Sequence, residues 1–158
     1  MGIVDRFDHI LTKFLMVTSS SLLLIITLVM FIEVVGRYVF LHSLPWAGEL
    51  MRYSAVWLVF LAGGLGVKRG AHISVKVITK RFPRDLQRSL ALFEYSMIGL
   101  FSAIMLWQGI KLVGLTAHQL SPSMHISMAI PYAAVPVGGL IMLIYGIILS
   151  SQTMIKSR

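Results

Sequence analysis

The feature that most constrains this chain is a set of four long apolar stretches, because each must be removed from water along most of its length. The first uncharged stretch, Phe14–Ile32, is 19 residues long. A helix needs about 20 apolar residues to cross the roughly 30 Å hydrocarbon layer of a bilayer. The pattern predicts an all-α integral membrane protein that forms a single domain over residues 1–158. Its four transmembrane helices are expected at about residues 14–38, 46–67, 86–115 and 127–149.

Composition argues against a soluble domain. Hydrophobic residues make up 57% of the chain and charged residues 13%, and a soluble domain of this size would expose large apolar patches. Cysteine is absent, which excludes disulfides, thiol nucleophiles and cysteine-ligated metals. The first apolar stretch exceeds the core of a secretory signal peptide, which is about 7–15 residues long. We therefore expect a permanent first helix.

The basic residues predict how the helices are oriented. Eleven of the 14 Lys and Arg residues fall near the two termini or in the middle loop, residues 68–88, and three fall on the opposite side. Cytoplasmic loops of membrane proteins carry the excess of Lys and Arg. We therefore expect both termini and the middle loop in the cytoplasm. The net charge of +8 is interpreted as this topology signal, and no nucleic-acid partner is expected.

The middle loop carries a helical pattern of its own. Apolar residues recur at steps of four, three and four: Ala71, Val75, Ile78 and Phe82. Basic residues alternate with them: Lys76, Lys80 and Arg81. This predicts a basic amphipathic helix between helices 2 and 3, lying on anionic phospholipids; a solvated basic loop is the alternative. Residues 3–14 are also amphipathic, and form either a separate interfacial lead-in or the start of the first helix.

Four charges gather at the outer ends of the first two helices. Glu33 and Arg37 are four residues apart, and Glu49 and Arg52 are three apart, so each pair shares a helix face. Charged residues inside a membrane are costly and are usually paired. The four charges could neutralise one another and fix helix packing. Alternatively, Arg37 and Arg52 could attract an anionic solute or dock an acidic partner.

No catalytic constellation is recognisable, so we do not expect an enzyme, a bound metal or a cofactor. The five histidines suggest a haem-binding redox anchor as an alternative, but they fall at predicted helix ends or in loops: His9, His42, His72, His118 and His125. Small residues crowd the inner end of the second helix: Ala62, Gly63, Gly64, Gly66 and Gly70. Such residues let membrane helices approach closely, which predicts packing within the bundle or with another membrane protein.

A series of short motifs extends over nearly the whole chain. They are Arg37-Tyr38-Val39-Phe40, Leu44-Pro45-Trp46 with Glu49, Arg52-Tyr53, Val56-Trp57-Leu58-Val59-Phe60-Leu61, Lys68-Arg69-Gly70-Ala71-His72-Ile73-Ser74-Val75, Ser121-Pro122, and Pro131-Tyr132 with Pro136. In their order and spacing they resemble the small membrane subunit of tripartite ATP-independent periplasmic (TRAP) transporters, the DctQ-like family. The chain departs from the family at Gly48 and Lys76, where many members carry acids.

The resemblance implies a non-catalytic subunit of an organic-acid uptake symporter in the bacterial inner membrane, for substrates such as dicarboxylates or sialic acid. A large TRAP membrane subunit would move the substrate in a sodium-driven elevator motion, and a periplasmic substrate-binding protein would deliver it. This chain would serve as a scaffold and help to dock that protein. For architecture and docking, the resemblance points to these residues: Arg37, Trp46, Glu49, Arg52, Trp57 and His72. The charge spacing adds Glu33 to the docking and structural charges, and the small-residue pattern adds Gly63, Gly64 and Gly66 to the packing contacts. An autonomous small channel is a further alternative.

Overall fold

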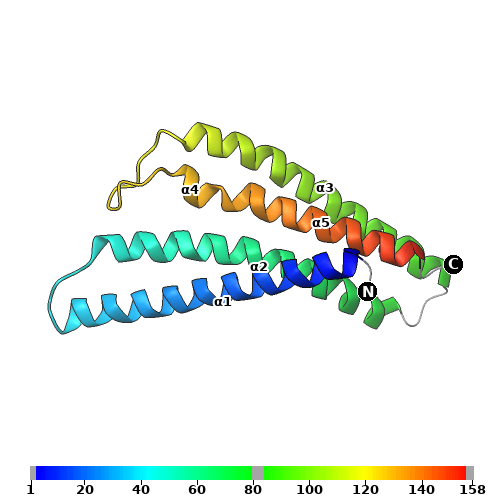
Figure 1. The fold of residues 1–158 in the computed structure, drawn as a ribbon, viewed down its shortest axis with the longest axis horizontal. Coiled ribbons are helices and arrows are strands. Elements are labelled where there is room, and N and C mark those ends of the chain that lie inside the picture. Colours follow the sequence, from blue (N-terminus) through cyan, green and yellow to red (C-terminus); the bar gives the residue numbers. More distant parts are fainter. Residues whose placement is uncertain (1–2, 80–83, 156–158) are drawn as a thin grey trace.

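A computed structural model of the chain describes residues 3–79 and 84–155, with side chains described at 6–68, 89–90 and 93–150. The described part is helical, without strands. Its helices are α1 (Ile3–Tyr38), α2 (Pro45–Thr79), α3 (Arg84–Thr116), α4 (Ala129–Tyr132) and α5 (Ala134–Ile155) (Figure 1). Four segments are long and apolar enough to cross a membrane: Arg6–Tyr38, Pro45–Lys68, Phe93–Thr116 and Ala129–Ser150. The all-α class and the four membrane helices are therefore confirmed.

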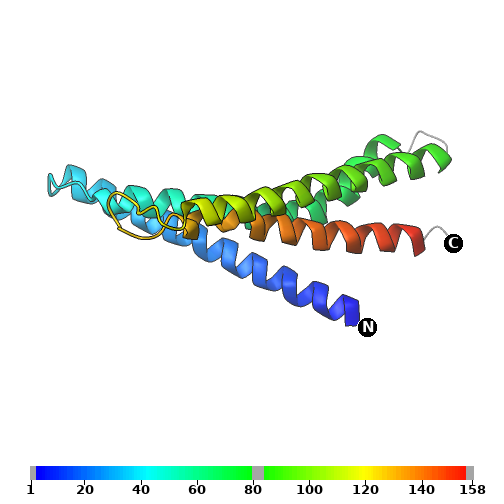
Figure 2. The same cartoon turned by 90° about the horizontal axis from the view of Figure 1, so that it is seen from above.

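The long helices form a row rather than a closed square. The main packing contacts join α1 to α2, α2 to α5, and α5 to α3. Along the helix axes, the two termini lie at one end of the molecule (Figure 1). The connections 39–44 and 117–128 lie at the opposite end, which we call the outer end. Toward its N-terminus α1 leaves the line of the other helices (Figure 2). Within the described residues, α2 is the one helix whose backbone closely approaches that of α1.

Glycines allow α5 to lie close against α2. A Cβ added at Gly64 would overlap the side chain of Ile141, and one added at Gly138 would lie 2.8 Å from Phe60 Cβ. Lipid tails are as apolar as leucine, so membrane helices gain association energy from close packing and not from hydrophobic burial. The small residues thus determine how near α2 and α5 can come, and Gly63 also meets α5, at Met142.

The contact between α3 and α5 is equally close. A Cβ added at Gly109 would lie 2.7 Å from Pro136 Cδ and 2.8 Å from its backbone nitrogen. One added at Gly139 would lie 3.0 Å from the backbone nitrogen of Leu106. These neighbours are backbone or ring atoms that cannot rotate away. Helix α5 is therefore held on two sides and has the largest buried share of the four spans.

Two helices extend beyond their predicted ends. Helix α1 is continuous from Ile3 to Tyr38, so residues 3–14 begin the first helix rather than forming a separate lead-in. Helix α2 does not end at residue 67 but continues to Thr79. No proline interrupts the sequence between Pro45 and Pro83. An interior glycine destabilises a helix by only about 1 kcal/mol, against about 3 kcal/mol for proline, so the glycines near residue 67 do not end α2.

This length bears on the predicted interfacial helix at residues 71–82. The 35 residues of α2 would measure about 52 Å at 1.5 Å per residue, more than the roughly 30 Å of hydrocarbon. The end of α2 must therefore extend past the hydrocarbon layer. Residues 71–79 belong to α2 instead of starting a new helix, and residues 80–83 lie outside the described part. A position on the lipid surface remains a prediction.

The last span is interrupted close to its start. The span expected at residues 127–149 is divided, because α4 ends at Tyr132 and α5 begins at Ala134. Pro136 has no backbone N–H and cannot bond to the carbonyl of Tyr132 four residues earlier. The missing bond coincides with the break between the two helices.

The close contact between α3 and α5 predicts unequal effects of two matched substitutions. Gly109→Ala places a methyl group against Pro136 and should destabilise the protein by about 1–3 kcal/mol, the usual cost of overpacking. Gly114→Ala, on the same helix, meets nothing within 4 Å and should be neutral or slightly stabilising. Thermal unfolding in detergent would measure both. Equal midpoints for the two variants would contradict this packing.

Candidate functional site

A buried carboxylate holds the outer loop between α3 and α4. Glu49, in the second turn of α2, is 2% exposed. Its Oε1 accepts a hydrogen bond from the backbone N–H of Ser123 at 2.9 Å, and its Oε2 accepts one from Met124 at 3.0 Å. Charge-assisted bonds of this kind are about twice as strong as neutral ones. Both oxygens therefore bind the tip of the 117–128 loop.

The same face of α2 makes two further contacts with this segment. Tyr53 and Trp57 follow Glu49 at steps of four, so the three side chains share one face. The Tyr53 hydroxyl donates to Met128 Sδ at 3.4 Å, and the Trp57 indole N–H donates to the carbonyl of Ile130 at 3.2 Å. We call Glu49, Tyr53 and Trp57 the latch. It fixes the outer loop and the start of the last span to α2.

The loop held by the latch is itself folded back on its own backbone. The Ser121 N–H donates to the Ile126 carbonyl at 2.9 Å, and the Met128 N–H to the Gln119 carbonyl at 2.8 Å. His125 has a φ of 53°, a left-handed conformation in which histidine is among the better tolerated side chains. The loop therefore has a defined shape that the latch positions.

The four outer charges do not form the expected mutual cluster. Arg37 pairs with Glu33 one turn away, whereas Glu49 binds loop amides, because the loop brings two unpaired N–H groups to a carboxylate that is already buried. Arg52 is exposed and has no hydrogen bond or ion pair within the described part of the chain. It is thus the cation of this group that remains available at the outer end.

A second polar network lies near the opposite end of the spans. Lys68 Nζ bonds to the carboxylate oxygens of Asp8 at 2.8 and 2.7 Å and to Thr12 Oγ1 at 2.6 Å. Thr12 Oγ1 also lies 3.1 Å from the hydroxyl of Tyr145, which is fully buried. This network joins α1, α2 and α5 directly above a core formed by Leu15, Leu61, Ile141 and Tyr145.

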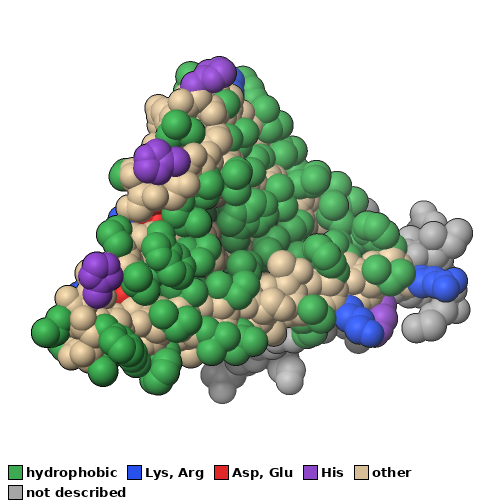
Figure 3. All heavy atoms as spheres, turned by 60° about the vertical axis from the view of Figure 1, so that its left-hand side comes forward, with side chains coloured by type: hydrophobic (Ala, Val, Ile, Leu, Met, Phe, Trp, Pro, Cys, Tyr) green, Lys and Arg blue, Asp and Glu red, His purple; other side chains and the backbone are tan. Residues whose placement is uncertain are grey.

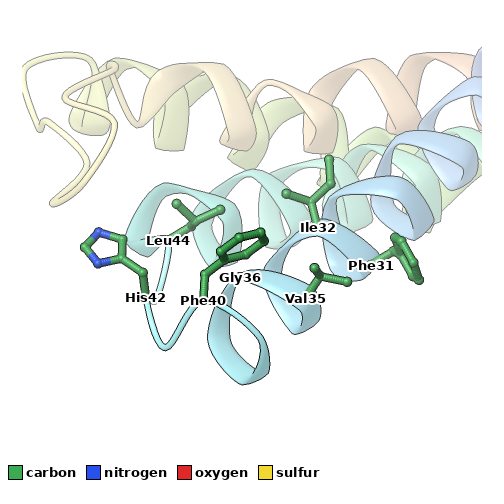
Figure 4. A pocket seen from close by; sticks show the side chains of 7 residues that line it. All are labelled: Phe31, Ile32, Val35, Gly36, Phe40, His42 and Leu44. Carbon is green, nitrogen blue, oxygen red and sulfur yellow. The ribbon is translucent and has the colours of Figure 1, made fainter.

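The outer end of α1 borders an open apolar cavity of about 370 Å³. Its lining comes from α1 and the 39–44 connection: Phe31, Ile32, Val35, Gly36, Phe40, His42 and Leu44 (Figure 4). Polar sites for organic acids need several converging hydrogen-bond donors or cations. Since His42 is the one polar side chain in this lining, the cavity does not have the chemistry of a carboxylate site.

The described histidines lie at the ends of the helices. His42, His118 and His125 belong to the outer connections, and His9 lies near the start of α1. Figure 3 shows histidines along the outer end beside a broad apolar surface. No group of three or more His, Cys, Asp or Glu residues within the described part is arranged to hold a metal. These positions give no support to haem held between facing helices.

The remaining candidate residues are placed as follows. Trp46 is partly exposed at the start of α2. Gly66 is exposed and a Cβ there would meet nothing within 4 Å, so it does not join Gly63 and Gly64 in packing on α5. The side chains of four candidates lie outside the described part: His72, Lys76, Lys80 and Arg81.

Sequence reasoning missed both polar networks. The latch has a local signal, the spacing of Glu49, Tyr53 and Trp57, but its partners are backbone groups about 75 residues away. The inner network could have been suggested by topology, since Asp8 and Lys68 fall at the same end of adjacent spans. Tyr145 gives no such signal, because tyrosines near helix ends are usually interface anchors.

Comparison with known proteins gives a consistent result. A family model described as the DctQ component of tripartite ATP-independent periplasmic transporters matches residues 26–153. The isethionate TRAP transporter permease protein DctMQ of Oleidesulfovibrio alaskensis is 30% identical over 144 residues, which cover 86% of this chain and 22% of that relative. The C4-dicarboxylate TRAP transporter small permease protein DctQ of Vibrio cholerae is 30% identical over 103 residues, covering 65% and 43%. The chain spans less than half the length of these relatives.

The latch predicts which loop amides are protected from hydrogen exchange. Glu49→Gln replaces one acceptor oxygen with an NH₂ group that cannot accept a bond from an N–H. Exchange at Ser123 and Met124 should therefore accelerate roughly tenfold or more, as expected when a charged acceptor is lost. Arg52→Gln, one turn along the same helix, is the matched control and should leave both amides unchanged. Unaltered protection in Glu49→Gln would show that the carboxylate does not hold the loop.

Proposed function

The chain belongs to the DctQ component family of tripartite ATP-independent periplasmic transporters, and on this premise we propose that it acts as a scaffold for a larger, sodium-driven elevator subunit. The family is a transporter component and not an enzyme. With its four apolar spans and its bacterial relatives, the chain is a multi-pass protein of the bacterial inner membrane.

The observation that carries the proposal is that several charges of the described spans are paired within the chain, with Arg52 and Glu94 as exceptions. Glu49 accepts hydrogen bonds from two loop amides, Lys68 forms an ion pair with Asp8, and Arg37 forms one with Glu33. Transport sites are usually built where interrupted helices expose backbone groups near mid-membrane. Here the break in the last span lies next to the outer loop, where Trp57 bonds to the carbonyl of Ile130. Within the described residues, these pairs leave few charged groups to bind a solute.

The relatives and the charge distribution support the proposed solute and orientation. Two relatives are named for isethionate and for C4-dicarboxylates, both small organic anions, so we assign a small organic acid such as a dicarboxylate or sialic acid to the complete transporter. The excess of Lys and Arg near the termini supports a cytoplasmic location for that end. The latch and the outer loops would then face the periplasm, and the basic residues at 71–82 would face anionic phospholipids.

Reconstitution tests the scaffold proposal. Vesicles holding this chain alone should not take up radiolabelled dicarboxylate, isethionate or sialic acid under a sodium gradient. Vesicles that also hold the large subunit encoded with it, supplied with the binding protein, should take up one of these anions. Omitting this chain should reduce that uptake. Sodium-dependent uptake by this chain alone would overturn the proposal.

The exposed and unpaired side chain of Arg52 at the outer end supports a second element, docking of the binding protein. Arg52 has no partner within the described residues, and rim charges mainly tune association with an oppositely charged protein. Arg52→Glu should raise the concentration of binding protein that gives half-maximal uptake, most strongly at low salt, without lowering the maximal rate. Lys13→Glu, near the N-terminus of α1 and far from the outer end, should leave the half-maximal concentration and the maximal rate unchanged. Loss of the assembled complex in Arg52→Glu would instead assign this residue to bracing.

A further inference from the structure

Helix α1 has one packed flank and two free flanks that differ in chemistry. Its packed flank includes Leu15 and Val29, which are 1% and 8% exposed. We propose that one free flank receives a transmembrane helix of the large membrane subunit, an inference that rests on the proposed function. We call this flank the free seam. It comprises Met16, Ser20, Leu23, Thr27, Met30 and Val34.

The spacing of the free seam is that of a helix-packing surface. Its members follow one another at steps of four and three residues, the heptad spacing with which helices pack side by side at small crossing angles. The packed flank repeats in the same way, and the free seam lies about 100° round the helix from it. Leu23 and Met30 are 55% and 57% exposed. The seam is thus formed and unoccupied by any described part of this chain.

The side chains of the free seam suit a protein neighbour better than lipid. Ser20 lies near the middle of the Arg6–Tyr38 span, and its hydroxyl, like that of Ser21 on the other free flank, has no hydrogen bond with any described residue. Thr27 donates to the carbonyl of Leu23 at 2.9 Å and keeps an acceptor free. Lipid tails offer no hydrogen-bond partner, whereas a neighbouring helix does, and small residues allow it to approach. Methionines on either side can adapt to its surface.

The other free flank has the opposite character. It carries bulky residues that are 53–68% exposed, namely Phe14, Val17, Leu24, Leu28 and Phe31. Ser21 is the small residue among them. Large, flexible and aromatic side chains keep a second helix at a distance and mix readily with lipid tails. The contrast between the two flanks selects the free seam as the protein-facing one.

Two observations identify the occupant as the large subunit. Within the described residues, the backbone of α1 closely approaches that of α2 alone, and α1 stands out of line toward its N-terminus (Figure 2). In the isethionate permease relative, the segment similar to this chain shares one polypeptide with a much longer remainder. A neighbour at a one-to-one ratio is thus built into that relative. The free seam is the surface of α1 that such a neighbour would fill.

A matched pair of substitutions tests the free seam. Ser20→Leu and Ser21→Leu make the same change at adjacent positions and equal depth, on different flanks. With the large subunit tagged, Ser20→Leu should reduce the co-purifying amount of this chain several-fold, and Ser21→Leu should leave it near the wild-type level. Circular dichroism and gel filtration of each variant alone check that the fold is retained. Equal co-purification of the two variants would overturn the assignment.

A second measurement does not depend on destabilising the complex. Because the chain has no cysteine, Ser20→Cys and Ser21→Cys each provide one site for a photoreactive maleimide. Irradiation should join the label at position 20, and not the label at 21, to the large subunit. A dimer of this chain, a lipid adduct alone or no adduct at position 20 would refute the proposal. Should uptake persist in that case, the scaffold function still stands; failure of the wild-type chain to co-purify with a large subunit would refute both.

Discussion

The close approach of α5 to its two neighbours is the contact on which the rest of the fold depends. Lipid does not drive apolar helices together, so their association relies on packing and on hydrogen bonds between helices. Glycines remove the side chains that would separate α5 from α2 at Gly64 and Gly138, and from α3 at Gly109 and Gly139. Helix α1 has no such contact with α5, and the Lys68 network and the Leu15 core supply its attachment instead.

The two polar networks of the described residues lie near opposite ends of the membrane spans. At the outer end the latch joins α2 to a loop and to the start of the last span, while at the inner end Lys68 and Tyr145 join three helices. Both networks hold groups that would otherwise be costly to bury. Contacts of this kind at both ends would suit the scaffold role proposed above.

The sequence was sufficient to predict the membrane spans, because apolar length is a direct requirement of the bilayer. It was insufficient for helix ends such as that of α2, since charge and glycine content near residue 67 suggested a stop that no proline enforces. The role of Glu49 was also out of reach. Its charge and spacing suggested a pairing with Arg52, but its actual partners are backbone amides whose position depends on the fold of the 117–128 loop. Glu33 and Arg37 were predictable because both partners lie on one helix.

The arrangement of the helices in a row has a hydrodynamic consequence. Four helices in line, spaced about 8–10 Å apart, make a wall roughly 35 Å long, with a longer outline in the bilayer plane than a square cluster of the same helices. In the proposed complex, any turning of the assembly within the membrane would sweep this wall broadside through the lipid and meet viscous drag. This drag would slow rotation of the whole assembly in the membrane plane.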